Sequence, residues 1–265
     1  MKYLTEQQVK KYQKDGFLLL KNFFSEEEME PINKSIEKFS RMKPGDWELG
    51  KEMAYYETNI ENERILCRIE KYVDYHQEFK KLANSEKILD ILEDLMGGPC
   101  ILFKDKINFK RSGGGGFRPH QDVQARWDDF IKYTMSVMIS TDHSTPENGC
   151  LEVAAGHHKR GLIGKYDRPL EGDDLTGMKF EKVATGIGDI LFFDHFTPHQ
   201  SKPNKSNKPR SNIYLTYNLL SDGQHRDEYL ERKRCELPPD NERREGMKFN
   251  DSPLHEAKYK ETKEN

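Results

Sequence analysis

The sequence predicts a mainly β protein, built as an antiparallel barrel or sandwich with helices packed on one outer face. Apolar and polar residues alternate with a period of two in several short runs between residues 100 and 220, and segments with helix-capping signals come before them. Short strands with turn signals, preceded by capped helices, are typical of this arrangement. We expect a single domain over 1–265, with the β core at roughly 100–220, N-terminal helices and an insert at 1–99, and a charged C-terminal tail at 221–265.

Helix signals are concentrated in the first hundred residues. The patterns T-x-x-Q at 5–8 and S-x-x-E at 25–28 are capping boxes, and each predicts the start of a helix. The second helix should bury one face, because apolar residues recur at helical spacing: Met29, Ile32, Ile36 and Phe39. A third helix is expected from Ser85 until the Gly-Gly-Pro at 97–99 ends it. Residues 42–80 have no clear period, so we expect either an insert over a pocket or a solvated surface loop.

The alternating runs predict the strands of the core. In the first of them one face carries Phe103, Asp105, Ile107 and Phe109, and the other carries Lys104, Lys106, Asn108 and Lys110. A strand with an apolar and a polar face can line a barrel with its polar side inward. Further strands are expected at 17–24, 133–141, 150–153, 190–193 and 213–219.

The segment Arg-Pro-His-Gln-Asp at 118–122 carries the main functional signal. His120 and Asp122 lie two residues apart, so in an extended segment both side chains point to the same side and can reach one metal ion. His199, which follows a predicted buried strand, is the best candidate for a third ligand. Two histidines and one carboxylate with open positions hold Fe(II) in non-haem oxygenases. The alternative is that both histidines are ordinary polar residues on loops.

A second signal is Arg210, which follows His199 by eleven residues and offers a planar guanidinium to a carboxylate. A 2-oxoglutarate co-substrate needs such a group. Arg210 has the same parity as Tyr214 and Thr216, so we expect all three to face the same interior if no bulge intervenes.

The composition argues against several classes of partner. Charged residues make up 34% of the chain and the net charge is -3, with both signs interspersed, so we expect no nucleic-acid or membrane binding. The four cysteines lack Cys-x-x-Cys spacing and the N-terminus lacks the apolar core of a signal peptide, so we expect a cytoplasmic protein. The expected partner is a small-molecule substrate, and nothing in the composition indicates an oligomeric state.

Several segments taken together resemble the phytanoyl-CoA dioxygenase family. The resemblance covers roughly residues 4–220 and rests on Lys106-Ile107-Asn108, His120-Gln121-Asp122, Asn148-Gly149-Cys150-Leu151, Gly156-His157-His158, and His199-Gln200-Ser201 through Pro209-Arg210. It implies a double-stranded β-helix core, the jelly roll of cupin-like proteins. It also implies a dioxygenase that uses Fe(II), 2-oxoglutarate and O₂.

The same resemblance implies roles for individual residues. His120, Asp122 and His199 would bind the iron, and Arg210 would bind the distal carboxylate of 2-oxoglutarate. By similarity to ectoine hydroxylase, a member of the family, further co-substrate contacts are implied for Asn108, Ser136 and Ser201. The implied reaction is hydroxylation of an unactivated C–H bond with release of succinate and CO₂. Desaturation or ring closure at the same site stays open.

Cations near the metal motif indicate the substrate class; they are Lys104, Lys106, Lys110, Arg118 and Arg126. They suit an anionic group, and the sequence is similar to a bacterial branch of the family that includes aminoalkylphosphonate hydroxylases. We therefore expect a small charged metabolite such as an aminoalkylphosphonate, with Glu70 or Asp105 available for an ammonium group. The candidate substrate residues are Lys106, Trp127, Arg68 and Glu70. The alternative is that the lysines form a solvated strand edge.

Two other functions remain open at this point. An acyl-CoA α-hydroxylase, which the family name suggests, would need an open apolar channel, and the sequence shows no obvious apolar lid. A non-catalytic binding protein on the same scaffold would be expected to lack at least one of the histidines, the aspartate or the arginine.

Overall fold

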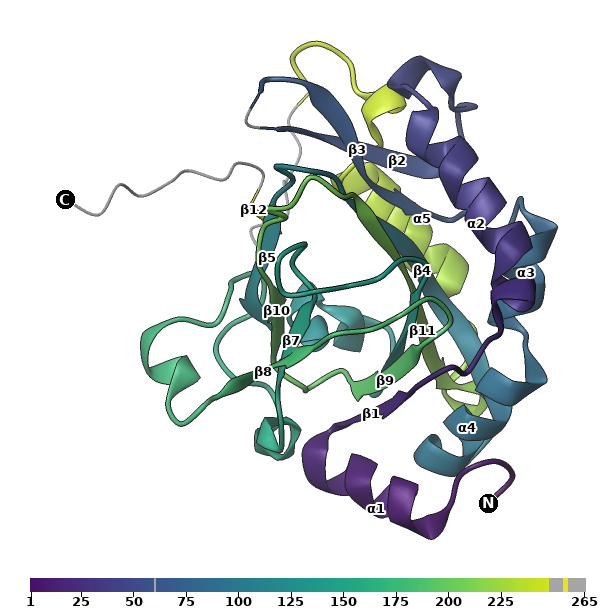
Figure 1. The fold of residues 1–265 in the computed structure, drawn as a ribbon, viewed down its shortest axis with the longest axis vertical. Coiled ribbons are helices and arrows are strands. Elements are labelled where there is room, and N and C mark those ends of the chain that lie inside the picture. The colour runs from purple at the N-terminus through teal and green to yellow at the C-terminus, as the bar shows by residue number, and fades with distance from the viewer. Residues whose placement is uncertain (60, 248–254, 257–265) are drawn as a thin grey trace.

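A computed structural model describes residues 1–59, 61–247 and 255–256 of the chain (Figure 1). Two antiparallel sheets face each other across an interior, and helices cover the outer face of the larger sheet. Most of the predicted tail beyond residue 247 lies outside the described residues.

The larger sheet has seven strands, in the order β1-β9-β6-β11-β4-β3-β2. Their bounds are β1 (Phe17–Leu20), β9 (Ile190–Asp194), β6 (Met135–Ser140), β11 (Arg210–Leu219), β4 (Cys100–Lys110), β3 (Arg64–Glu70) and β2 (Met53–Thr58). The smaller sheet has five strands, in the order β12-β5-β10-β7-β8. Their bounds are β12 (His255–Glu256), β5 (Gly116–His120), β10 (His199–Ser201), β7 (Leu151–Ala154) and β8 (Phe180–Val183).

Five α-helices and several short 3₁₀ helices complete the described structure. The α-helices are α1 (Glu6–Asp15), α2 (Glu26–Arg41), α3 (Gln77–Ala83), α4 (Glu86–Met96) and α5 (Arg226–Glu236). The 3₁₀ helices are η1 (Pro44–Asp46), η2 (Asp122–Ala125), η3 (Trp127–Asp129), η4 (His157–Arg160), η5 (Gly172–Leu175), η6 (Leu220–Asp222) and η7 (Asp240–Glu242). Both predicted capping boxes are present, at Thr5 with Gln8 and at Ser25 with Glu28.

None of the helices in the described ranges is long and apolar enough to cross a membrane.

The apolar face of α2 is buried as predicted, and it belongs to the main core. Met29, Ile32, Ile36 and Phe39 share one hydrophobic cluster with residues from α4 and from the outer face of the larger sheet. The helices and the sheet thus form two layers, and the apolar core between these layers stabilises the sheet from its outer face. The inner face carries polar side chains along part of the sheet and a second apolar cluster against the smaller sheet, which includes Met138, Leu191 and Phe193.

The pairing of β4 with β11 sets which side chains face the interior. Lys110 lies opposite Arg210, Asn108 opposite Asn212, and the register continues in this way along both strands. Ile107 packs in the outer core with the helices, so its sequence neighbours point inward. A bulge near Thr216 breaks the alternation, and Phe103 therefore packs with Trp127 and Tyr229 instead of with Ile107 as the sequence pattern predicted.

The segment 42–80, expected to be irregular, contains two strands. β2 and β3 extend the larger sheet beyond β4, and β3 places Arg68 opposite Asn108 and Glu70 opposite Lys106. The pairing of β2 with β3 shifts register between Tyr55 and Tyr56. Such a shift disrupts the period of two, which explains why the sequence pattern did not reveal these strands.

The turn before β9 depends on a close backbone approach at Gly188. Its φ is 78°, and a Cβ there would lie 2.1 Å from the carbonyl oxygen of Phe24. Gly97, which ends α4, has a φ of 82° but nothing within 4 Å of the same position. We expect Gly188→Ala to lower the free energy of unfolding by about 1–3 kcal/mol more than Gly97→Ala, because only the first adds a clash to the left-handed strain. Urea unfolding of both variants measures this, and equal losses would contradict the packing described.

Candidate active site

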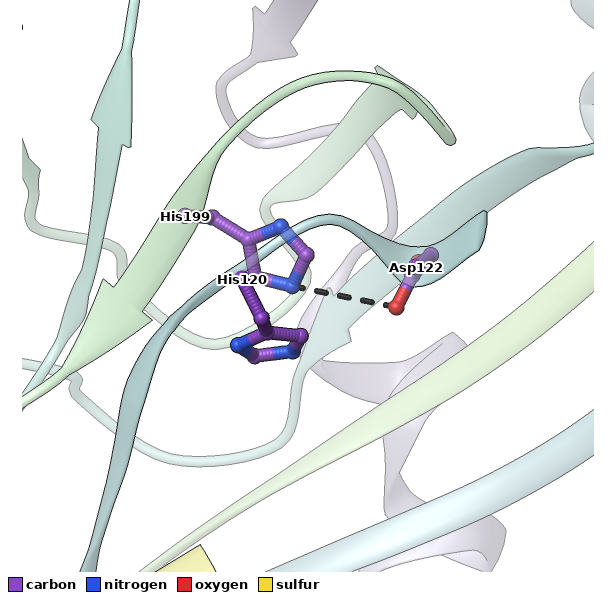
Figure 2. Close-up of side chains that lie close together, drawn as sticks. All are labelled: His120, Asp122 and His199. Atoms are coloured by element: carbon purple, nitrogen blue, oxygen red, sulfur yellow. Dashed lines mark ion pairs between the residues drawn. The ribbon is translucent and has the colours of Figure 1, made fainter. Parts of the chain in front are cut away.

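The pairing of β5 with β10 brings the two predicted histidine ligands together. His120 is the last residue of β5, His199 is the first of β10, and the two lie directly opposite each other in the antiparallel register. Asp122 follows two residues after His120, where the chain leaves the sheet in η2. One potential ligand atom from each of the three residues lies within 4.8 Å of the others (Figure 2).

Backbone carbonyls fix the orientation of both imidazoles. His120 Nδ1 lies 2.7 Å from the carbonyl oxygen of Arg118, and His199 Nδ1 lies 3.0 Å from that of Thr197. A carbonyl oxygen only accepts, so Nδ1 must carry the proton in each ring and Nε2 keeps its lone pair. This is the usual outer contact of a metal-binding histidine.

The third member of the group, Asp122, is held in a similar way. Its Oδ2 accepts a hydrogen bond from Ser136 Oγ at 2.5 Å, while Oδ1 lies 3.8 Å from His199 Nε2. The carboxylate is thus oriented from β6, and its other oxygen faces the imidazoles (Figure 2).

The electrostatics of the three residues favour a divalent cation. Burial, followed by the charge of His199, lowers the pKa of His120 to about 3, and burial also lowers the pKa of His199. Burial opposes ionisation of Asp122, but His199 and Lys106 outweigh it and lower the pKa of the carboxyl. Two neutral imidazoles and one carboxylate, all buried and gathered on one side, fit the donor set that holds non-haem Fe(II).

The residues predicted to contact a co-substrate lie on the inner faces of both sheets. Arg210 is buried, and its guanidinium donates hydrogen bonds to the carbonyl oxygens of Asn148 and Gly149. Ser201 lies two residues beyond His199 on β10. Asn108 is buried on β4, and its Oδ1 has no hydrogen-bond partner in the part of the chain that the structure describes. Ser136, in contrast, is bonded to Asp122, so its contact here is with a candidate ligand.

A buried cluster of charges lies beside these residues, around Glu70. Lys233 Nζ is 2.5 Å from its carboxylate, Arg68 Nε is 3.3 Å away and Lys104 Nζ is 3.7 Å away. Burial opposes ionisation of Glu70, but Lys104, Lys233 and Arg68 outweigh it and lower its pKa. Three cations therefore surround one carboxylate.

Lys233 was missed as a site residue by the sequence analysis. It lies on α5, within a Lys- and Arg-rich run of the predicted tail, and such a run usually indicates a solvated helix. The sequence around Lys233 therefore did not indicate that α5 packs against the sheet and brings this lysine to Glu70.

Lys106 lies on the inner face between this cluster and the candidate metal ligands. Its Nζ is 4.7 Å from the ring centroid of Tyr214, and its charge interacts with both Asp122 and Glu70. Burial, followed by the charge of Lys104, lowers its pKa to about 8. Its side chain is nevertheless partly accessible to solvent. The interior is therefore open beside Lys106.

Trp127 lies next to Lys104. The Lys104 Nζ is 5.1 Å from the indole centroid, which places a cation over the aromatic face. Trp127 itself is buried in the cluster with Phe103 and Tyr229. The indole of Trp127 thus helps to hold the Lys104 ammonium in the interior.

The fold and the three gathered side chains define a class of protein. An antiparallel jelly roll that presents two histidines and a carboxylate on one side is the arrangement of non-haem oxygenases.

Comparison with known proteins identifies the family. The chain belongs to the phytanoyl-CoA dioxygenase family, whose model matches residues 12–212. It is 36% identical over 253 residues to a 2-aminoethylphosphonate dioxygenase from uncultured bacterium HF130_AEPn_1, covering 94% of this chain and 95% of that protein. It is 38% identical over 236 residues to a methylphosphonate hydroxylase from Gimesia maris, covering 87% of each.

Solved structures show the same fold. The crystal structure of EctD from S. alaskensis with 2-oxoglutarate and 5-hydroxyectoine matches with a TM-score of 0.71 at 21% identity, covering 83% of this chain and 77% of that one. A second EctD structure contains bound Fe, and matches with a TM-score of 0.68 at 19% identity, covering 83% of this chain and 79% of that one. The predicted family, jelly-roll core and dioxygenase class are confirmed, and the predicted cofactors agree with the contents of these relatives. The roles of individual residues stay predictions.

Metal binding gives the first test of the site. We expect Co(II) to raise the melting temperature of the protein, since metal at about 100 times its dissociation constant stabilises the folded state by about 2.7 kcal/mol. His199→Ala should abolish most of this shift, because it removes one of the three gathered ligands. His225→Ala is the control, since that imidazole bonds to the Asp222 carbonyl oxygen, away from the site. A full metal-induced shift in His199→Ala would contradict the assignment.

Proposed function

We propose that this dioxygenase uses Fe(II), 2-oxoglutarate and O₂ to hydroxylate an unactivated C–H bond of a small metabolite that carries a phosphonate group. The reaction releases succinate and CO₂. The observation that carries this proposal is the excess of positive charge on the inner face of the larger sheet, beside the candidate metal ligands. Arg68, Lys104 and Lys233 face one carboxylate there, and Lys106 adds a further cation.

The chain contributes the ligands and the anchors. His120 and His199 each present Nε2, Asp122 presents Oδ1, and the carbonyl and hydroxyl contacts behind them hold these atoms in place. Bound iron and 2-oxoglutarate together supply the activation of O₂. Arg210 anchors the distal carboxylate of 2-oxoglutarate, for which its planar guanidinium is suited. The open side of the three ligands is left to the co-substrate and O₂.

The anionic end of the substrate binds at Lys106. Lys106 is partly buried and forms no ion pair within 4.0 Å among the described residues. Withdrawing such a cation from water has a cost, and a phosphonate would supply the missing negative charge together with several acceptor oxygens. Lys106 also interacts with Asp122, so an anion held there lies next to the metal ligands. The relatives named for 2-aminoethylphosphonate and methylphosphonate support the same chemical class.

Glu70 receives a role different from the one the sequence suggested. Its carboxylate is surrounded by Lys233, Arg68 and Lys104, so it has little capacity to receive an ammonium group from a substrate. Instead it holds these cations in position around the interior. Trp127, beneath Lys104, assists in the same task.

The alternatives are less consistent with these contacts. A long acyl chain would need an apolar channel, whereas the inner face beside the ligands carries Lys104, Lys106 and Arg68. A non-catalytic binding protein would have no need for the full set of two histidines and a carboxylate in close proximity. We also propose that the chain acts as a single domain in the cytoplasm, without nucleic-acid or membrane contacts, as its balanced charge suggests.

A substrate screen tests the proposal directly. We expect methylphosphonate or 2-aminoethylphosphonate to stimulate succinate release by the Fe(II)-loaded enzyme above the level seen with 2-oxoglutarate alone. Parallel reactions contain an acyl-CoA or no second substrate. Stimulation by the acyl-CoA alone would overturn the phosphonate assignment, and no oxygen uptake under any condition would favour a binding protein.

Lys106 provides a sharper test of the anion site. We expect Lys106→Met to raise the KM for the phosphonate by about 10- to 100-fold, because a hydrogen bond to a charged group contributes about 1.5–3 kcal/mol. Lys132→Met is the matched control, since Lys132 is exposed. Steady-state kinetics at saturating 2-oxoglutarate measure both variants. An unchanged KM in Lys106→Met would place the anionic group elsewhere.

A further inference from the structure

Apart from the cations around Glu70, the interior contains a pair of buried basic residues where β4 ends and β11 begins. Lys110 and Arg210 are directly opposite each other in the antiparallel register, and each is only 3% exposed. Like charges directly opposite in a sheet destabilise it. Burial, followed by the charge of Arg210, lowers the pKa of Lys110 well below its usual range.

The groups that accept hydrogen bonds from this pair are neutral. Lys110 Nζ donates to Ser201 Oγ at 2.8 Å and to the carbonyl oxygens of Lys202 at 2.6 Å and Gly149 at 3.3 Å. The Arg210 guanidinium donates to the carbonyl oxygens of Asn148 and Gly149. Neither Lys110 nor Arg210 forms an ion pair within 4.0 Å in residues 1–59 and 61–247. The carboxylates of Glu57, Glu152 and Asp142 act on them only from farther away. Two adjacent buried basic groups therefore share several neutral acceptors, and within the described ranges no carboxylate is in direct contact with either of them.

The position of the pair is set relative to the candidate metal ligands by β10. His199 and Ser201 lie two residues apart on this strand, so both point to the same side and their Cα atoms are separated by about 7 Å. Lys110 Nζ contacts Ser201. An anion held between Lys110 and Arg210 would thus lie a short distance along the interior from His199, as the second acid group of a short diacid would.

We propose that Lys110 is a second co-substrate-binding residue, which together with Arg210 forms a two-cation site for the distal carboxylate of the oxo diacid. This inference rests on the proposed function. The bound carboxylate supplies a directly contacting counter-charge, which no carboxylate in the described part of the chain provides, and Ser201 adds a hydroxyl beside it. The pair selects an oxo diacid over an oxo monoacid, because only the diacid brings the second negative charge.

A purely structural role for Lys110 makes a different prediction. As a link between the carbonyl oxygens of Gly149 and Lys202, it would hold two loops together whatever ligand is present. Its loss would then weaken the binding of diacid and monoacid alike. Binding of the two kinds of oxo acid separates these roles.

The experiment uses isothermal titration of the full-length protein loaded with Mn(II), without O₂, against 2-oxoglutarate and 2-oxopentanoate. The second compound keeps the oxo acid end and lacks the distal carboxylate. The variants are Lys110→Met and Lys110→Gln, of which the second removes the charge but keeps an N–H donor for a carbonyl oxygen. Lys208→Met, an exposed lysine two residues before Arg210, is the matched control.

We expect both Lys110 variants to bind 2-oxoglutarate at least tenfold more weakly than the unaltered protein, with 2-oxopentanoate affinity changed less than twofold. Lys208→Met should match the unaltered protein. Unchanged 2-oxoglutarate affinity in Lys110→Gln, or an equal loss for both acids, would overturn the inference while leaving the proposed function intact. Failure of the unaltered Mn(II)-loaded protein to bind 2-oxoglutarate would overturn both.

Discussion

The register between β5 and β10 is the constraint on which the rest of the site depends. It places His120 directly opposite His199, and the chain then turns so that Asp122 joins them. A slip of one residue between these strands would turn one imidazole to the opposite face of the sheet and separate the ligands. The backbone carbonyl oxygens that accept hydrogen bonds from both Nδ1 atoms also orient the two imidazole rings. The smaller sheet therefore supplies the two histidines, η2 supplies the aspartate, and the larger sheet supplies side chains that surround them.

Unbalanced charge is the second feature of the interior. Cations are gathered at two places on the inner face of the larger sheet, around Glu70 and at the pair formed by Lys110 and Arg210. In our proposal the phosphonate binds at Lys106, beside the first group, and the distal carboxylate of the co-substrate binds at the second. Ligands that bind only the folded state stabilise it, so these anions would offset the cost of burying the charges.

Much of this arrangement could be predicted from the sequence because it follows from local patterns. The alternation along β4 and β11 indicated which side chains face inward, and the His-x-Asp spacing indicated that His120 and Asp122 share a side. Other features depend on tertiary contacts that leave no local signal. The register shift in β2 disrupted the alternation there, and Lys233 enters the interior from a helix whose sequence suggests exposure. The engagement of Glu70 by three cations could not be known before those segments were placed.

The most direct test of the whole account is a crystal structure of the protein with Fe(II), 2-oxoglutarate and a phosphonate, obtained without O₂. We expect one iron ion bound by His120 Nε2, Asp122 Oδ1 and His199 Nε2, with the distal carboxylate of 2-oxoglutarate at Arg210 and the phosphonate at Lys106. Iron bound elsewhere, or a 2-oxoglutarate whose distal carboxylate points away from Arg210, would contradict it.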